Sequence, residues 1–374
     1  MSIGKAKVFL RSKLSQKDNR PIARALSKNI AFSWDDRIIL TQARGGKSIN
    51  DLARLLKKEI NYILKRIIWL EEQGFIYLKF PCEDPVLKNL YERKISAKRI
   101  CQQHHGMSNI IAYEREWDVY SPALDFLNKD SENYKLKRLE KEIYFSLIHR
   151  FLKKIPKGSF IIDAGGGIGR FAFELIKNGY KVHLVDSSEV ALKKALRHFV
   201  SENLNSFDLH WGNVSNLSMF KDNTFNAAFA IELICYTDRP DQALKELVRV
   251  TKKDGLIILS VEGKYGGMLS DPNVSLDKLS TILQDNLLYV KNHLYVNYYT
   301  PRSLESLLKG CGIEVIDIIG SHYITDGVFH KLIDIDKLED KDYKEAVLKL
   351  EKLCQKDLIL KNLARAWVAV GRKK

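Results

Sequence analysis

The stretch Asp163-Ala164-Gly165-Gly166-Gly167-Ile168-Gly169 decides the fold of this 374-residue chain. It directly follows the short apolar run of residues 159–162, and residues 170–177 behind it have helical apolar spacing. The glycines therefore form a turn between a buried parallel strand and a helix. Glycines let the backbone approach a ligand closely, and a helix N-terminus offers free N–H groups. We predict an α/β fold with a ligand site at this turn.

The spacing of the glycines separates two kinds of nucleotide-binding turn. The dinucleotide fingerprint G-x-G-x-x-G, started at Gly165, requires a glycine at position 170, where this chain has Arg170. The pattern present is D-x-G-x-G-x-G, which resembles the signature loop of class I S-adenosylmethionine-dependent methyltransferases. The resemblance covers residues from about 140 to 374 and implies a seven-stranded Rossmann-like sheet with S-adenosylmethionine as cofactor.

The resemblance also implies roles for residues of the loop. In the family the leading acid, here Asp163, lies near the amino-acid half of the cofactor. Gly165, Gly167 and Gly169 make room for the cofactor.

The second predicted strand, 181–185, ends at Asp186, about 20 residues after Gly165. Doubly wound folds place an acid here, because a carboxylate accepts two hydrogen bonds from a ribose diol. We expect Asp186 to bind the ribose, with Ser187 beside it in the cofactor site. The alternative is a surface acid that caps the next helix.

A third strand, 207–211, precedes Asn213 and Val214, at the place where the family usually has an acid beside the adenine. The carbonyl oxygen of an amide can still accept a hydrogen bond from the exocyclic amine of adenine. Asn213 and Val214 are therefore candidate cofactor residues.

The loop 232–236 follows the fourth strand, 225–231, at the sheet edge where open α/β sheets bind ligands. Glu232 is a candidate cofactor residue and Tyr236 a candidate catalytic residue. The loop has neither the N/D-P-P-Y motif of amino-nucleobase methyltransferases nor the Pro-Cys nucleophile of the cytosine C5 enzymes. The His-Asp pair of plant-type O-methyltransferases is also absent, so the acceptor is not identified.

Further helices and strands of the predicted sheet follow the fourth strand: helix 239–253, strand 256–261, helix 300–308, strand 313–318 and the closing strand 364–372. The insertion 264–299 should cover the acceptor, with His293 as its candidate catalytic residue. Three tyrosines are its other polar lining: Tyr295, Tyr298 and Tyr299. The alternative for His293 is an ordinary packed or exposed histidine. The charged, helical segment 326–362 is a second insertion.

The N-terminal 80 residues form a smaller domain. Helical patterns at 36–43, 48–56 and 60–74, followed by strand 75–78, resemble a winged helix-turn-helix. Ser48 and Asp51 form a capping pattern. Such a module reads DNA, forms a dimer, or recognises a peptide leader as an added strand. The third helix is largely apolar, which leaves Asn61, Lys65 and Arg66 as its candidate nucleic-acid contacts.

Residues 81–140 are a predicted helical linker and candidate lid before the methyltransferase domain, 141–374. Trp117 and Tyr120 lie over the cofactor pocket in this interpretation; the alternative is aromatic packing between the domains. We predict no metal site, because adjacent histidines such as His104-His105 rarely reach one ion. The five cysteines include no C-x-x-C pair.

The formal net charge of +15 is concentrated near the N-terminus, where residues 1–80 carry 17 Lys and Arg against 7 Asp and Glu. Such a surface attracts nucleic acid, an acidic peptide or an anionic membrane; the alternative is a solvated face. The first residues lack an apolar signal core, and apolar runs are too short for a membrane span. We expect a cytoplasmic protein.

The leading hypothesis is a methyltransferase that acts on an O or N atom of a small metabolite or a peptide, such as a ribosomally made natural-product precursor. The N-terminal domain then recognises substrate or forms a homodimer. The alternative is a nucleic-acid-directed protein, either an RNA methyltransferase or a cofactor-sensing transcription regulator, which we do not favour.

Overall fold

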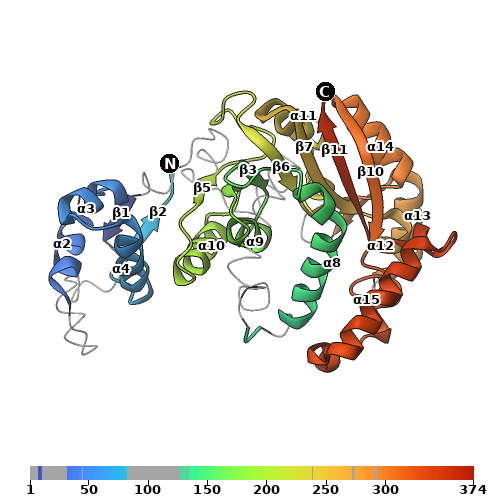
Figure 1. Ribbon diagram of the computed structural model, residues 1–374, viewed down its shortest axis with the longest axis horizontal. Helices are drawn as coiled ribbons and strands as arrows, with labels where there is room; N and C mark the ends of the chain where they lie inside the picture. The colour runs from blue at the N-terminus through green and yellow to red at the C-terminus, as the bar shows by residue number, and fades with distance from the viewer. Residues whose placement is uncertain are drawn as a thin grey trace.

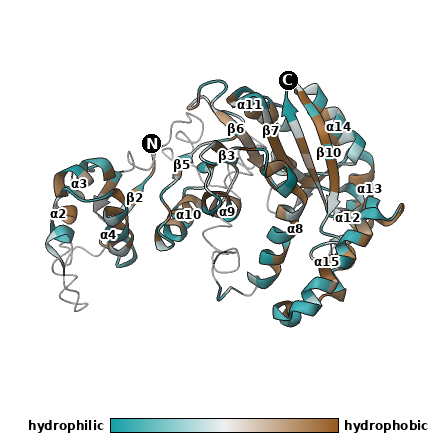
Figure 2. Cartoon of the chain, in the orientation of Figure 1, coloured by the Kyte–Doolittle hydropathy of each residue, from teal (hydrophilic) through white to brown (hydrophobic). Residues whose placement is uncertain are grey.

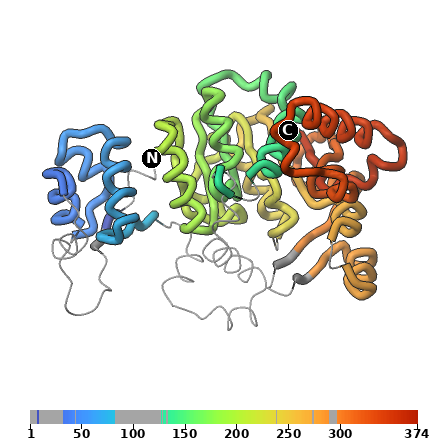
Figure 3. The backbone as a smooth tube through the Cα atoms, turned by 90° about the horizontal axis from the view of Figure 1, so that it is seen from below, coloured from blue at the N-terminus to red at the C-terminus, as the bar shows by residue number. Residues whose placement is uncertain are grey.

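The computed structural model describes residues 7–10, 32–43, 45–81, 127, 129–131, 134–237, 239–271, 274–290 and 294–374. A small N-terminal unit stands at one end of the molecule, and residues 322–363 lie at the other (Figures 1 and 3). The predicted His104-His105, Trp117 and Tyr120, and the candidate catalytic His293, lie outside the described residues. No helix within the described residues is long and apolar enough to cross a membrane.

A seven-stranded sheet forms the centre of the larger unit, as predicted. Its strands in spatial order are β10 (Ile313–Ser321), β11 (Ala366–Lys373), β7 (Thr251–Glu262), β6 (Phe225–Ala230), β3 (Phe160–Ala164), β4 (Lys181–Asp186) and β5 (Phe207–Trp211). The strands β3 to β7 are parallel, and β11 runs antiparallel to both its neighbours. The strand order reverses between β4 and β6 around β3. This switch point places a ligand site at the carboxyl ends of β3, β4 and β6.

Helices cover both faces of this sheet, which explains why its strands are continuous apolar runs. Ile161 and Ile162 are adjacent in β3 but belong to two different buried clusters, because successive side chains of a strand point to opposite faces. One face packs on α9 (Arg170–Lys177) and α10 (Glu189–Ser201), and the other on α11 (Pro240–Val250) and α14 (Pro301–Gly310). Apolar residues gather on the strands, and the outward sides of the helices are hydrophilic (Figure 2).

Two segments beyond the basic sheet pattern match the predicted insertions. Between β7 and α14 lie α12 (Lys264–Ser270), α13 (Leu276–Asp285) and the paired strands β8 (Leu287–Val290) and β9 (Leu294–Asn297). After β10 come η3 (His330–Leu332), η4 (Ile335–Glu339), α15 (Lys341–Lys356) and η5 (Leu360–Leu363). This second segment packs against α8 (Tyr134–Leu152), a helix that contains the predicted domain boundary after residue 140.

One predicted helix end is wrong. The helix expected to continue to Lys253 ends at Val250, and β7 begins at Thr251. Thr251 is extended, and its hydroxyl donates to the carbonyl of Leu247, so the side chain ends the helix that it follows.

The N-terminal unit contains β1 (Lys7–Leu10), α2 (Trp34–Ala43), α3 (Ile49–Leu56), α4 (Ile60–Glu72) and β2 (Ile76–Lys79). The two strands pair antiparallel. The predicted capping box of α3 is confirmed, since the Ser48 hydroxyl accepts from the Asp51 N–H at 3.1 Å. The buried side of α4 is apolar, as expected.

α4 also faces the larger unit through α10. The Nζ of Lys65 donates to the Asn203 side chain at 2.7 Å, and Glu71 lies 3.3 Å from Arg197. The backbone N–H of Phe80 donates to Glu189 at 3.0 Å. The polar side of the third helix is therefore engaged with the larger unit.

Candidate functional site

The glycine loop between β3 and α9 has the backbone that its sequence predicts. Gly165, Gly167 and Gly169 have φ values of 66°, 53° and 82°, in the left-handed region that L side chains rarely adopt. A Cβ on Gly169 would lie 2.4 Å from the ring of Phe199, and one on Gly165 would lie 2.5 Å from Leu233. The loop can follow this path only with glycine at these positions.

Asp163 lies beneath the loop as a support for it. Its carboxylate accepts a hydrogen bond from the Ala172 N–H, in the first turn of α9, at 3.1 Å. Burial raises the pKa of Asp163 to about 7. A Cβ on Gly166 would lie 2.6 Å from this carboxylate, so Gly166, which the sequence interpretation left without a role, is the glycine that admits it.

Asp186 joins the end of β4 to the same loop. One carboxylate oxygen accepts from the Gly167 N–H and the other from the Ser188 N–H, both at 2.8 Å. Burial raises the pKa of this carboxyl group. The carbonyl of Ser187 accepts from the Trp211 indole at 2.9 Å, which fixes the turn after the acid.

Asn213 and Val214 follow β5 next to this turn. The Gly212 N–H donates to the Asp186 carbonyl at 3.0 Å. The Asn213 side chain accepts from the Ser215 N–H at 2.9 Å, and Val214 is buried. The structure thus brings the predicted cofactor residues after β3, β4 and β5 to one sheet edge.

Glu232, after β6, occupies a strained position at this edge. Its φ of 53° is unusual for a residue with a side chain, and its N–H donates to the Ser260 hydroxyl at 2.9 Å. The carboxylate accepts from the Tyr144 hydroxyl at 2.9 Å and lies 3.4 Å from Arg170, yet its side chain is 42% exposed. Burial disfavours the charge, but Arg170 and Lys137 outweigh it and lower the pKa of Glu232 to about 2.

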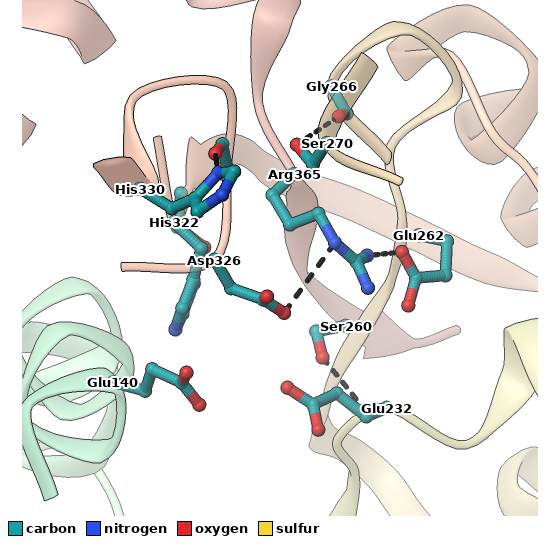
Figure 4. Close-up of polar contacts among 12 residues, drawn as sticks. Glu140, Glu232, Ser260, Glu262, Gly266, Ser270, His322, Asp326, His330 and Arg365 are labelled. Atoms are coloured by element: carbon teal, nitrogen blue, oxygen red, sulfur yellow. Dashed lines mark hydrogen bonds and ion pairs between the residues drawn. The ribbon is translucent and has the colours of Figure 1, made fainter. Parts of the chain in front are cut away.

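A group of ionisable side chains surrounds Glu232, and we call it the polar cluster. Figure 4 shows four of its members: Glu140, Glu232, His322 and Asp326. Its members come from α8, α9, the end of β6 and the segment after β10: Lys137, Glu140, Tyr144, Arg170, Glu232, His322 and Asp326. Glu140 is 1% exposed and lies 2.8 Å from Lys137 and 3.5 Å from Arg170. Sequence reasoning named only Glu232 among them. The i, i+3 spacing of Lys137 and Glu140 in an amphipathic helix was the available signal.

Tyr236 lies on the neighbouring side of the site. Its hydroxyl donates to Glu262, which also forms an ion pair with Arg365. The Arg365 Nε atom lies 3.6 Å from Asp326, and this contact connects the Tyr236 side to the polar cluster (Figure 4).

The insertion after β7 contributes buried phenols to this side. Tyr298 and Tyr299 are buried, and burial raises the pKa of Tyr298 to about 12. Both phenols are therefore neutral at physiological pH. The side chain of Tyr295 is not described.

Metal-ligating side chains do not gather anywhere in the described part of the chain. Cys235, Cys311 and Cys354 are buried free thiols. Burial holds the pKa of the Cys235 thiol well above its usual range, so this thiol is a neutral, packed group.

Comparison with known proteins identifies the domain. Residues 162–259 match a protein family described as a methyltransferase domain. A sterol methyltransferase-like protein of Botryococcus braunii is 32% identical over 102 residues, which is 27% of this chain and 26% of that protein. A mitochondrial ubiquinone biosynthesis O-methyltransferase of Dictyostelium discoideum is 24% identical over 180 residues, 45% of this chain and 53% of that protein. The chain thus spans between about a quarter and a half of these curated relatives.

Among solved structures, the Burkholderia thailandensis 1,6-didemethyltoxoflavin-N1-methyltransferase has a TM-score of 0.44 and 14% identity, covering 71% of this chain and 89% of that one. The family match and the strand order together show that the chain contains an S-adenosylmethionine-dependent methyltransferase domain with the class I fold.

Proposed function

We propose that the protein transfers a methyl group from S-adenosylmethionine to an oxygen or nitrogen atom of a small metabolite or a peptide. The observation that carries this proposal is the position of the polar cluster beside the glycine loop. Glu232 and Arg170 belong to this cluster, and Arg170 opens the helix that follows the loop. A methyltransferase chiefly needs to align its acceptor and remove a proton, and this arrangement supplies polar groups for both tasks.

The residues at the sheet edge fit S-adenosylmethionine. The cofactor's amino-acid portion carries an ammonium and a carboxylate, and Glu232 and Arg170 offer the complementary charges 3.4 Å apart. Asp186 offers a carboxylate for the ribose hydroxyls, with Ser187 beside it. When bound, the cofactor supplies a methyl group on a positively charged sulfur.

The loop residues support this site in different ways. Gly165 and Gly167 let the backbone approach the cofactor, and Gly169 begins α9. Asp163 holds the loop against the first turn of that helix. Asn213 and Val214 lie beside the adenine in this proposal.

The acceptor lies on the side of Tyr236, Glu262 and Asp326, below the insertion after β7. The names of the curated relatives, which refer to sterol and ubiquinone, support a small acceptor. A peptide acceptor, such as a natural-product precursor, stays a prediction. Tyr236 is a candidate to orient the acceptor through its hydroxyl, and the catalytic role of His293 also stays a prediction.

The N-terminal unit is a winged-helix-like module in this proposal, and it recognises substrate or forms a homodimer. Within residues 7–10, 32–43 and 45–81, the order of strand, three helices and strand supports the winged-helix comparison. Residues 1–80 form this module and residues 141–374 the catalytic domain, with 81–140 between them. A location in the cytoplasm is part of the same proposal.

A nucleic-acid acceptor is less well supported by the contacts of α4. Lys65 donates to Asn203, and Arg66 makes two hydrogen bonds to the buried carboxylate of Asp36. Two of the three candidate contacts therefore already bind other residues of this chain. Only the basic charge of residues 1–80 favours the alternative.

Labelled methyl transfer tests the proposal. The purified protein should move the methyl group of S-adenosylmethionine into a deproteinised extract of small molecules and peptides. Asp186→Ala should abolish cofactor binding by calorimetry and also abolish transfer. Glu202→Ala, an exposed acid after the C-terminal end of α10, is the matched control and should behave like the wild type. Unchanged cofactor affinity in Asp186→Ala would refute the site assignment.

A further inference from the structure

Beside the proposed methyl-transfer site, His322 has a buried ring nitrogen that no described residue pairs with. The residue is 2% exposed. Its Nδ1 lies 2.7 Å from the Ser321 hydroxyl, whereas Nε2 has no hydrogen bond within the described residues. Buried polar atoms are almost always paired, so a polar atom left open at this place needs an explanation. Figure 4 shows the imidazole directed into the space between Glu140 and Asp326.

The backbone of His322 is held in a strained conformation by a second buried group. Its φ is 61°, in the left-handed region. The carboxylate of Glu351, on α15, accepts from the N–H groups of His322 at 2.5 Å, Tyr323 at 3.0 Å and Ile324 at 3.2 Å. Burial raises the pKa of Glu351 to about 7, although these N–H groups favour its charge. Strain maintained by a buried carboxylate is typical of functional positions.

The surroundings keep the imidazole neutral. Burial lowers the pKa of His322 to about 4. The charged groups that face it are Glu140 and Lys137 from α8, Arg170 from α9 and Glu232 from the end of β6. When Nδ1 donates to Ser321, Nε2 carries the lone pair, and it can accept a proton from a bound molecule.

Tyr144 connects His322 to the corner proposed to hold the cofactor's amino-acid portion. The centroids of the two rings are 4.3 Å apart. The Tyr144 hydroxyl donates to Glu232, and Ser260 contacts both of these residues. One side chain, that of Tyr144, therefore separates His322 from Glu232. Figure 4 shows His322 on the same side of Glu232 as Asp326.

We propose that Nε2 of His322 is the general base of the methyl transfer, and that the acceptor atom carries an O–H or N–H proton. This inference rests on the proposed function. The acceptor's proton passes to Nε2, and the acceptor's lone pair forms the bond to the methyl carbon. The sulfur keeps the electron pair of the broken C–S bond, which leaves a neutral thioether. The imidazolium then releases its proton to water. Glu351 is a positioning residue, because it holds the backbone of His322.

His322→Asn is the informative variant. Asparagine tolerates the left-handed backbone and retains a polar group, but it is not a base. S-adenosylmethionine affinity should stay within about threefold of the wild type, whereas transfer into the deproteinised extract should fall at least about 100-fold. His149→Asn, an exposed histidine on α8, should leave both unchanged. His322→Gly should also lose transfer, although glycine adopts the left-handed backbone without strain.

Glu351→Gln tests the positioning role separately. The NH2 group of the glutamine cannot accept hydrogen bonds, so some of the backbone N–H groups of residues 322–324 lose their acceptor. Transfer should therefore fall about tenfold while cofactor affinity is retained. The imidazole resonance of His322, assigned by its loss in His322→Asn, should not titrate between about pH 6 and 8 in the wild type. In Glu351→Gln it should shift, because the ring is no longer held in the same place.

The outcomes separate the two proposals. If the wild type transfers methyl groups and His322→Asn stays within about threefold of that rate, His322 is not the base, but the methyltransferase proposal stands. If the imidazole resonance titrates with an ordinary histidine pKa, the assignment of His322 as a buried, neutral base is wrong. If the wild type binds S-adenosylmethionine and transfers nothing, the proposed function fails and this inference fails with it.

Discussion

The two halves of the site are built in different ways. The proposed cofactor half consists mainly of backbone: glycines at positive φ, supported from below by Asp163 and from the side by Asp186. The proposed acceptor half consists of polar side chains from α8, the end of β7 and the segment after β10. Glu232 and Arg170, which face the cofactor in this proposal, join the two halves. This difference indicates that a short local turn is enough to hold the methyl donor, whereas the acceptor surface is assembled from segments that are distant in the sequence. Substrate preference can change in the second half while the first stays intact.

The backbone half should be the more sensitive to a single change. Gly167→Trp places a large side chain at a φ of 53° inside the proposed cofactor site, so S-adenosylmethionine affinity should fall at least about 1000-fold, or about 4 kcal/mol. Calorimetry measures this affinity. Gly179→Trp is the control: Gly179 also has positive φ, 85°, but it is exposed beyond the far end of α9. Equal loss of affinity in both variants would show a general folding defect.

Mutations in the side-chain half should lower the stability of the protein. Glu140→Gln removes a buried charge that contacts Lys137 and Arg170. The loss of this compensation for two cations should lower the free energy of unfolding by about 3 kcal/mol. Glu142→Gln, two residues along α8, breaks only partly exposed ion pairs and should cost less than about 1 kcal/mol. Urea unfolding compares them. Equal small effects would mean that the polar cluster is solvated rather than buried.

The support under the glycine loop should make stability depend on pH. The pKa of Asp163 in the folded protein is about 7, above its value in the unfolded chain. Its contribution to the free energy of unfolding is therefore present at low pH and is lost as the pH rises through about 7. Asp163→Asn cannot titrate and keeps an acceptor for the Ala172 N–H. Between pH 5 and pH 8, the free energy of unfolding of the variant should rise by on the order of 2 kcal/mol relative to that of the wild type, as measured by urea unfolding. A difference that does not change with pH would contradict the buried, neutral carboxyl.

Much of the backbone half could be predicted from sequence, because its signals are local. The glycines, Asp163 and Asp186 lie in or directly after strands with clear apolar patterns. The acceptor half depends on contacts between distant residues: Tyr144 meets Glu232 across 88 positions, and His322 meets Glu351 across 29. No local pattern marks these partners, since tertiary packing alone brings them together. The same limit applies to α4, whose Lys65 was a candidate nucleic-acid contact but reaches Asn203.

The N-terminal unit should show the smallest effects. Lys65→Ala removes an exposed hydrogen bond and should change stability by less than about 0.5 kcal/mol. Its binding to duplex DNA should stay like that of the wild type, which we expect to be weak, without sequence preference, and lost between low and physiological salt. Fluorescence anisotropy across a salt series measures this. A clear loss of tight, sequence-selective binding in Lys65→Ala would support the nucleic-acid alternative instead.

The most direct test of the central claim is the formation of S-adenosylhomocysteine from S-adenosylmethionine by the purified full chain. The reaction is measured with a deproteinised small-molecule and peptide extract, with transfer RNA, and with duplex DNA. The account predicts that the extract stimulates product formation, that neither nucleic acid does so, and that Asp186→Ala removes the stimulation. Product formed with either nucleic acid but not with the extract would contradict the account.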